Sequence, residues 1–268
     1  MRNGNKVRCM AAVKVMKHTR SGPFWLYIFI LAALCWLSTR SLLAQTANGW
    51  GEIWQQRMSI GQARLDEAFK LAESGKATEA LTRIDAIINS NPDNWRAHFL
   101  KAAVLVLVKR QDDALQQIDL SIKLAKKGNA SQSLLAQLYS SKARTCIDAH
   151  RYEDARKALD GAVHIDPTDT TSLNDLAWLL ATSPEPHVRN PHRAIALAQK
   201  CCGLNHWTNA YSIDTLAAAY AAKGDFGEAV RYQQLAMQAL NKSERTEQLD
   251  AMEGRLKLYS NHQSYQGD

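Results

Sequence analysis

The sequence lacks the short motifs that carry most enzyme chemistry. No phosphate-binding Walker loop, dinucleotide fingerprint, nucleophile elbow or H-E-x-x-H metal motif occurs in its 268 residues. Only five cysteines are present, and none stands in a C-x-x-C or C-x-x-C-H spacing, which excludes the common dithiol and haem-attachment motifs. We therefore expect no catalytic activity and no bound cofactor or metal.

The cysteines also give little support for a disulfide framework. Cys9 and Cys35 precede the main body, which leaves Cys146, Cys201 and Cys202. Adjacent cysteines rarely bond each other without strain. All three fall on helix faces expected to point inward, so we predict small buried apolar side chains.

Acidic residues are missing from the first 50 positions, which hold seven Lys and Arg. Residues 51–268 then carry 26 basic and 26 acidic side chains, so the net charge of +7 belongs entirely to the N-terminal segment. A neutral body lacks the electrostatic footprint of a nucleic-acid-binding protein. We predict no nucleic-acid partner.

A fourteen-residue run without polar side chains, residues 24–37, follows six of these basic residues. A basic segment before a short apolar core is typical of a secretory signal. The stretch 21–39 is just long enough to span a membrane if it is not cleaved. Residues 1–45 are thus a signal peptide or a membrane anchor, and both alternatives place the body in the cell envelope of a bacterium, periplasmic or anchored to the inner membrane.

A helix-turn-helix pattern recurs along the body. Apolar residues at three- and four-residue spacing give each helix one buried stripe, and an alanine marks the close crossing of each pair. Ala80 and Ala114 are 34 residues apart, and Ala155 follows after 41. Five units are expected: three over about 61–93, 95–128 and 132–169, a fourth whose first helix covers 172–181, and a fifth over about 210–242.

The units are not uniform. Seven extra residues lie near 126–132, where they lengthen a loop or the next helix, and three of the six prolines fall within 182–191, which predicts a loop there. His187 and His192 lie in or beside that loop, but no cysteine or carboxylate pair completes a metal site around them. A lone amphipathic helix is expected from Thr246 to Tyr259, before a polar tail that frays.

This pattern resembles the tetratricopeptide repeat family. Units four and five, with LAWLLATSPEPHVRNPHRAIALA and YSIDTLAAAYAAKGDFGEAV, look like a variant found in large bacterial proteins of the planctomycete and verrucomicrobial type. The resemblance implies an all-α, right-handed α-solenoid over 61–242, preceded by a lead-in segment at 46–60 and closed by a capping helix and tail at 243–268. Its groove would be lined mainly by the first helix of each unit.

By that geometry, eight side chains from first helices would line the groove. Trp178, Asn174 and Asp214 could form an aromatic shelf with polar flanks, or they could fill the junction between units. The full set is Phe69, Arg96, Phe99, Arg144, Asp148, Asn174, Trp178 and Asp214.

Solenoids bind partners along extended surfaces far more often than they catalyse. We expect a non-catalytic scaffold that holds a protein or peptide in its groove. The alternatives are binding of a cell-envelope glycan, with Trp178 as the stacking platform, and a structural assembly subunit. The sequence leaves the oligomeric state open.

Overall fold

A computed structural model describes residues 61–240 and 247–267. The chain divides into two compact units, Met1–Gln62 and Ala63–Asp268. The apolar run 24–37 and the expected lead-in segment at 46–60 lie outside the described residues. Within the part that the structure describes, no helix is long and apolar enough to cross a membrane.

The described residues form helices and no strands. A helix over 61–73 precedes the labelled elements. The others are α3 (Ala77–Ser90), α4 (Trp95–Leu107), α5 (Gln111–Lys127), α6 (Gln132–Asp148), α7 (Tyr152–Ile165), α8 (Thr170–Thr182), α9 (Pro191–Leu204), α10 (Ala210–Lys223), α11 (Phe226–Ala239) and α12 (Glu247–Ser260).

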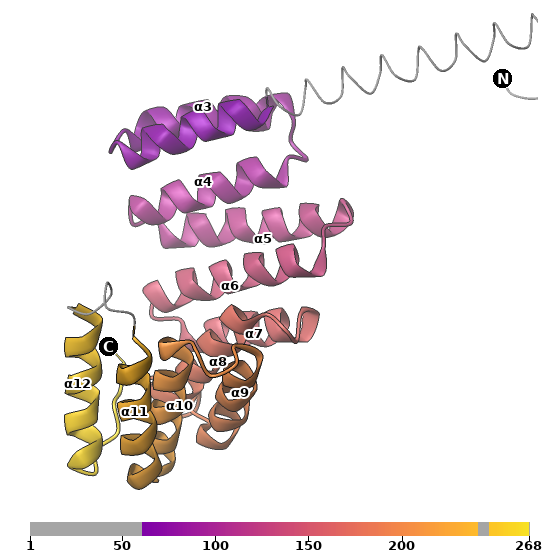
Figure 1. Ribbon diagram of the computed structural model, residues 1–268. Helices are drawn as coiled ribbons and strands as arrows, with labels where there is room; N and C mark the ends of the chain where they lie inside the picture. The colour runs from indigo at the N-terminus through magenta and orange to yellow at the C-terminus, as the bar shows by residue number, and fades with distance from the viewer. Residues whose placement is uncertain (1–60, 241–246, 268) are drawn as a thin grey trace, which may run out of the picture. The chain divides into compact units, whose positions relative to one another are not determined.

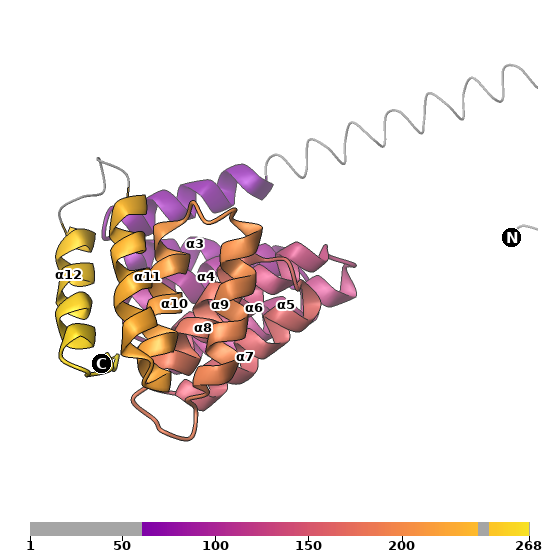
Figure 2. The same ribbon diagram turned by 60° about the horizontal axis from the view of Figure 1, so that its bottom comes forward.

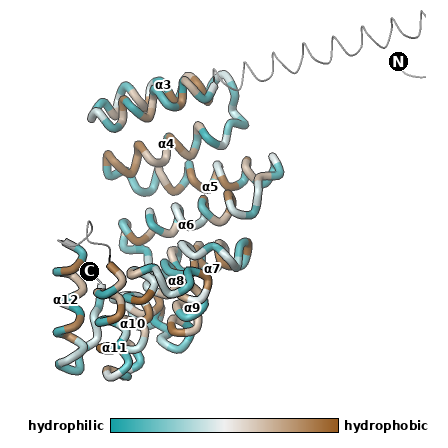
Figure 3. The backbone as a smooth tube through the Cα atoms, in the orientation of Figure 1, coloured by the Kyte–Doolittle hydropathy of each residue, from teal (hydrophilic) through white to brown (hydrophobic). Residues whose placement is uncertain are grey.

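Each helix from α3 to α12 packs against the helices next to it in the chain (Figures 1 and 2). First helices of successive units also touch, α6 with α8 and α8 with α10. The alternation of hydrophobic and hydrophilic positions along each helix is visible in Figure 3. The five predicted helix pairs are confirmed.

The turns inside units one, two, three and five place a left-handed residue after the first helix. Gly75 and Gly224 supply it with φ of 80° and 87°. Unit two has no glycine there, and Lys109 adopts φ 60° instead, while His150 adopts 54° in unit three. A non-glycine residue can occupy this conformation at a modest cost in free energy, which explains how the turn forms without glycine.

Alanines at the helix crossings are fully buried, as predicted: Ala80, Ala114 and Ala155 expose 0% of their surface. A larger side chain at these points would force the helix axes apart. The core is divided into clusters along the array rather than gathered in one centre. Stability in such an array depends on each unit and its neighbours.

The seven extra residues before unit three lengthen helices, not the loop. Helices α5 and α6 have 17 residues each, against 14 in α3 and 13 in α4. Only 128–131 separate them. Helix α5 ends at its C-cap Gly128, and α6 begins after the N-cap Ser131, whose side chain accepts a hydrogen bond from the Leu134 amide.

The proline-rich segment of unit four is a loop over 183–190, as predicted. Val188 is 1% exposed and anchors it to the core. The Asn190 amide donates to the Leu180 carbonyl at 2.8 Å, and the Asn190 side chain caps α9, which begins at Pro191.

Helix α12 confirms the predicted terminal helix and packs on α11. Its Met252 and Tyr259 are 1% and 0% exposed. The prediction of a fraying tail is wrong. Residues 263–267 return to α8, where the Gly267 amide donates to the Thr182 carbonyl at 2.8 Å.

Cys146, Cys201 and Cys202 are buried and free, as predicted. Burial raises the pKa of all three thiols, that of Cys202 to about 12. In the unfolded chain they titrate near 9.0.

This difference predicts a loss of stability at alkaline pH. The folded pKa lies above the unfolded one, so the contribution of Cys202 is intact below pH 9.0 and is lost as pH rises towards 12. We expect the free energy of unfolding to fall by about 1.4 kcal/mol per pH unit in that window from Cys202 alone. Urea unfolding across the window measures it, and Cys202→Ala should flatten the slope; an unchanged slope would contradict the assignment.

Candidate functional site

A hollow of about 400 Å³ lies between successive first helices, α4, α6 and the start of α8. Side chains of α4 and Ile118 of α5 form one wall, and polar side chains of α6 and α8 form the other. Its lining residues are Phe99, Ala102, Ala103, Val106, Ile118, Gln137, Ser140, Ser141, Arg144, Thr145, Asp148, Asp169 and Thr171.

The apolar wall arises because α4 is apolar on more than one face. Ala97, Val104 and Leu105 point into the core with 0–2% exposure, while Phe99 and Val106 are half-buried and line the hollow. Ala103 is exposed at the same wall. The small side chains of this wall leave the space that makes the hollow.

The polar wall follows one face of α6. Gln137, Ser141, Arg144 and Asp148 recur at four- and three-residue steps, which places them in one row along the helix. The Ser140 and Ser172 hydroxyls are hydrogen-bonded at 2.7 Å and join α6 to α8 behind this row. The helix that carries the row is therefore joined to α8.

Charges on this wall are weakly paired. The Arg144 guanidinium lies 3.8 Å from the Asp175 carboxylate and its side chain is 72% exposed, so the pair contributes little. Burial raises the pKa of Asp175, and Arg144 partly offsets this shift. Asp169 caps α8 by accepting from the Ser172 amide at 3.0 Å.

Asp148 is the last residue of α6, where a negative charge faces the negative end of the helix dipole. Among the described residues it forms no ion pair or side-chain hydrogen bond. The structure thus gives Asp148 no stabilising role in the fold.

Proteins similar to this chain are found among solved structures. No family model matches the chain, and no curated protein matches it. A crystal structure of MamA is 16% identical with a TM-score of 0.55, covering 70% of this chain and 95% of that one. The structure of YrrB, described as a TPR protein with an unusual peptide-binding site, is 15% identical with a TM-score of 0.53, covering 71% and 90%.

The chain has the tetratricopeptide repeat fold. A third similar structure is the APC/C hetero-tetramer Cut9–Hcn1, with 14% identity, a TM-score of 0.55, and coverage of 75% of this chain and 36% of that one. At these identities the likeness concerns the fold alone. It agrees with the family resemblance drawn from the spacing of the alanines.

Three of the eight predicted groove residues of this TPR array come together in the hollow: Phe99, Arg144 and Asp148. Phe69 is 47% exposed and Arg96 is exposed, but neither lines the hollow. The Arg96 guanidinium instead lies 4.4 Å from the ring centroid of Trp95.

The remaining three, Asn174, Trp178 and Asp214, lie at the junction of α8, α10 and α12. Asp214 is 5% exposed, and Arg255 of α12 contacts both its carboxylate oxygens at 2.9 Å. The Gln233 amide also donates to Asp214 at 2.7 Å. Its carboxylate is fully engaged inside the protein.

Trp178 is half-buried, and its ring is met by Tyr265 at 5.7 Å between centroids and by the Arg255 guanidinium at 5.4 Å. The Oδ1 atom of Asn174 is buried without a hydrogen-bond partner in the described structure. Trp178 therefore does not present an open stacking shelf for a glycan.

Two residues that sequence reasoning missed, Arg255 and Tyr265, close this junction. Both belong to the C-terminal 22 residues, far in sequence from their partners on α8 and α10. The one signal in the sequence concerns Tyr265, which is an aromatic residue within an otherwise polar tail.

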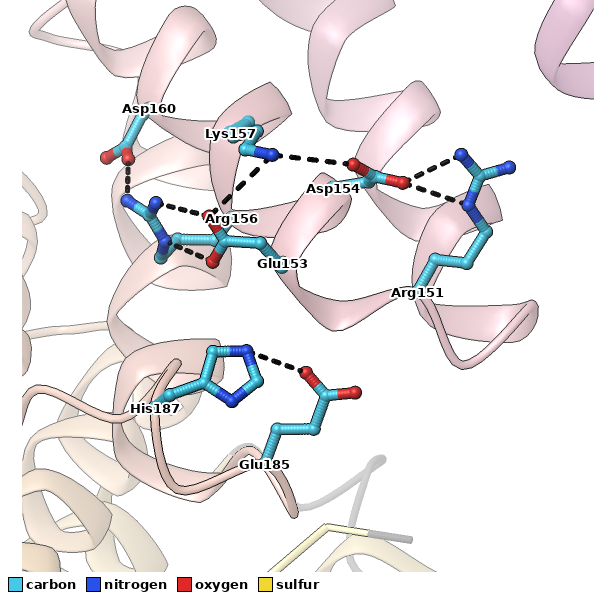
Figure 4. Close-up of polar contacts among 8 residues, drawn as sticks. All are labelled: Arg151, Glu153, Asp154, Arg156, Lys157, Asp160, Glu185 and His187. Carbon is cyan, nitrogen blue, oxygen red and sulfur yellow. Dashed lines mark hydrogen bonds and ion pairs between the residues drawn. The ribbon is translucent and has the colours of Figure 1, made fainter.

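The second helix of unit three carries a network of ion pairs on its outer side (Figure 4). Arg156 joins Glu153 and Asp160 at 2.7 and 2.8 Å, and Lys157 lies 3.8 Å from Glu153 and Asp154. These groups neutralise one another, and their exposure makes each pair weak.

In the proline loop, His187 lies 3.3 Å from Glu185 (Figure 4) and His192 is exposed. Across residues 61–240 and 247–267, no group of three or more potential metal ligands gathers. His187 thus contacts a residue of its own loop, and His192 belongs to the first turn of α9.

Proposed function

We propose that this protein is a non-catalytic interaction module whose hollow between α4, α6 and α8 binds a segment of a protein partner. The observation that carries the proposal is the hollow itself: one apolar wall, and one polar wall whose Arg144 and Asp148 have unused hydrogen-bonding capacity. Such a division suits a peptide that buries an apolar side chain and pairs its polar groups.

The row of polar side chains along α6 favours an extended peptide segment over a compact metabolite. A volume of about 400 Å³ takes one or two large side chains, and the row on α6 continues the polar contacts along the helix. YrrB, which shares the fold, is described as having a peptide-binding site. This likeness supports the class of partner and says nothing of its sequence.

We also propose that the module works in the bacterial cell envelope, exported or anchored through residues 21–39, and that it belongs to the bacterial TPR variant named above. The support is the basic segment and apolar run, and the sequence of units four and five. Protease digestion of spheroplasts, with and without detergent, tests the location. Digestion of the body in intact spheroplasts supports export, and protection until detergent is added contradicts it.

Site-specific photo-crosslinking in the full-length chain tests the hollow as the binding site. A photoreactive residue replaces Gln137 in the hollow or, as the matched control, Gln116, an exposed glutamine on α5 outside it. We expect one partner to crosslink through position 137 and not through position 116. Equal crosslinking at both positions, or none at 137, contradicts the proposal.

Asp148 offers a prediction that separates binding from folding. Asp148→Asn removes an unfavourable charge at the end of α6, so the free energy of unfolding should rise by about 0.3–1 kcal/mol. Crosslinking through Gln137 should fall at the same time, because the partner loses a charged contact. Asp154→Asn is the control: it removes a favourable acid from the first turn of α7 and should lower stability without changing crosslinking. A fall in stability for Asp148→Asn would show that Asp148 serves the fold.

A further inference from the structure

The segment 263–267 lies on α8 as a bound peptide would. Tyr265 and Gly267 are half-buried, whereas Gln263, Ser264 and Gln266 are exposed. Alternation of this kind is what an extended chain gives when one side faces a surface. Figure 1 shows this part of the chain turning back from the end of α12 alongside α11.

Contacts inside the protein hold the side chains beneath the segment in place. Trp178 offers its ring to Tyr265, and the Arg255 guanidinium lies 5.4 Å from the Trp178 ring and 5.7 Å from the Tyr265 ring. Arg255 is held in place by Asp214, with a side chain only 13% exposed. The cation–aromatic contacts therefore need little rearrangement when a second ring arrives.

A main-chain acceptor completes the site. The last carbonyls of a helix have no partner inside the helix, and the Thr182 carbonyl at the end of α8 accepts the Gly267 amide at 2.8 Å. A β-carbon at Gly267 would meet Thr182 only at ordinary contact distance, 3.6 Å. The site thus recognises an aromatic ring and, two residues later, a backbone N–H donor, and it does not require glycine.

The position of Trp178 in the repeat links this surface to the groove. Trp178 in unit four lies 34 residues, one repeat, after Arg144 of unit three, and Arg144 lines the open hollow. The chain's own tail therefore covers in unit four a surface equivalent to one that is open in unit three.

Few contacts hold the segment down. The exposed Gln263, Ser264 and Gln266 side chains make no hydrogen bond to other described side chains. One ring contact, one cation–aromatic contact and two main-chain hydrogen bonds, from the Gln263 amide to the Leu258 carbonyl and from the Gly267 amide to the Thr182 carbonyl, fasten residues 263–267. Such a set is weak enough for an incoming peptide to replace.

We propose that Trp178, Thr182 and Arg255 form a second peptide-binding site, occupied in the free protein by residues 263–267. Its ligand class is an extended peptide with an aromatic side chain followed two residues later by a residue other than proline. The partner's ring takes the place of Tyr265, and the tail is released. This site does not depend on the hollow between α4, α6 and α8, so either proposal can fail alone.

The test uses full-length chains and a fluorescent peptide with the sequence of residues 261–268. Fluorescence anisotropy measures its affinity for the wild type, for Tyr265→Ala, and for Tyr265→Ala with Trp178→Ala. In the wild type the tethered tail competes at a high effective concentration. We expect Tyr265→Ala to bind the peptide at least about tenfold more tightly than the wild type, and the added Trp178→Ala to abolish the gain.

Two altered peptides check the contacts: one with alanine at the tyrosine, and one with proline at the glycine, which removes the N–H donor. Both should lose binding to Tyr265→Ala. Equal affinity of the wild type and Tyr265→Ala, or no effect of Trp178→Ala, overturns the proposal.

If Tyr265→Ala does not fold, Gly267→Pro opens the site while keeping the ring. It removes the hydrogen bond to Thr182 and should also raise the affinity for the peptide. Circular dichroism establishes that each variant keeps its helices. An affinity for Gly267→Pro no higher than that of the wild type overturns the proposal.

Discussion

Replacement of Arg255 by methionine should lower the free energy of unfolding by about 3–5 kcal/mol, because it leaves the Asp214 carboxylate buried without its counter-charge. The side chains of this pair are 13% and 7% exposed, so water cannot replace the guanidinium. Gln233 alone would remain to donate to the carboxylate. Chemical denaturation of the full-length chain measures the loss.

The loss of stability in Arg255→Met should depend on pH. Burial raises the pKa of Asp214 from its ordinary value of 3.8, and Arg255 and Gln233 oppose this shift. Without Arg255 the folded pKa rises further above the unfolded one. The variant is then most stable below pH 3.8 and loses stability as pH rises through the folded pKa of Asp214. The difference in the free energy of unfolding between the variant and the wild type should therefore become smaller at acid pH.

Two controls separate the buried pair from charge in general. Arg231→Met removes an arginine whose side chain is 57% exposed and should lower stability far less than Arg255→Met does. Joining Arg255→Met with Asp214→Leu removes both charges and should recover most of the lost stability. A double variant as unstable as Arg255→Met would show that packing, not the uncompensated charge, causes the loss.

Leu176→Ala should lower the free energy of unfolding by about 2–5 kcal/mol, since Leu176 is 0% exposed in the core of unit four and its truncation leaves a cavity. Because the core is divided along the array, the effect should be local. Hydrogen exchange should quicken in α8–α11 well before α3. Leu107→Ala, at a leucine 64% exposed, is the matched control and should change stability by less than about 0.5 kcal/mol.

A uniform acceleration of exchange, reaching α3 as strongly as α8, would contradict the segmented core. The prediction follows from the helix contacts, in which each helix touches its chain neighbours and first helices touch those of the next unit. No described contact carries a disturbance in α8 directly to α3.

The repeat itself was predictable because local chemistry fixes it. Alanines at the crossings, a left-handed turn residue and three- and four-residue apolar spacing all act within one unit. The secondary structure of the seven extra residues was not predictable, because the spacing of the repeats gives the number of added residues but does not show whether they lengthen a helix or a loop. The 17 residues of α5 and α6 settle that point.

The groove was predictable in part for the same reason. Phe99, Arg144 and Asp148 follow from the face of their own helices, and the structure brings them together in the hollow. Trp178 and Asp214 depend on what the chain does later. Arg255 lies 41 residues beyond Asp214, and Tyr265 comes from a tail whose composition gives no periodic signal. Only tertiary packing shows that these residues cover the junction.

The hollow between α4, α6 and α8 is the surface proposed to receive the partner. Ala103 is exposed at its apolar wall, so Ala103→Trp fills the space without entering the core. Calorimetric titration of the partner identified by crosslinking measures the outcome, with Gln116→Trp on α5 as the matched control outside the hollow. We predict that Ala103→Trp weakens binding by about a hundredfold or more while Gln116→Trp binds as the wild type. Equal affinity of the two tryptophan variants would contradict the account.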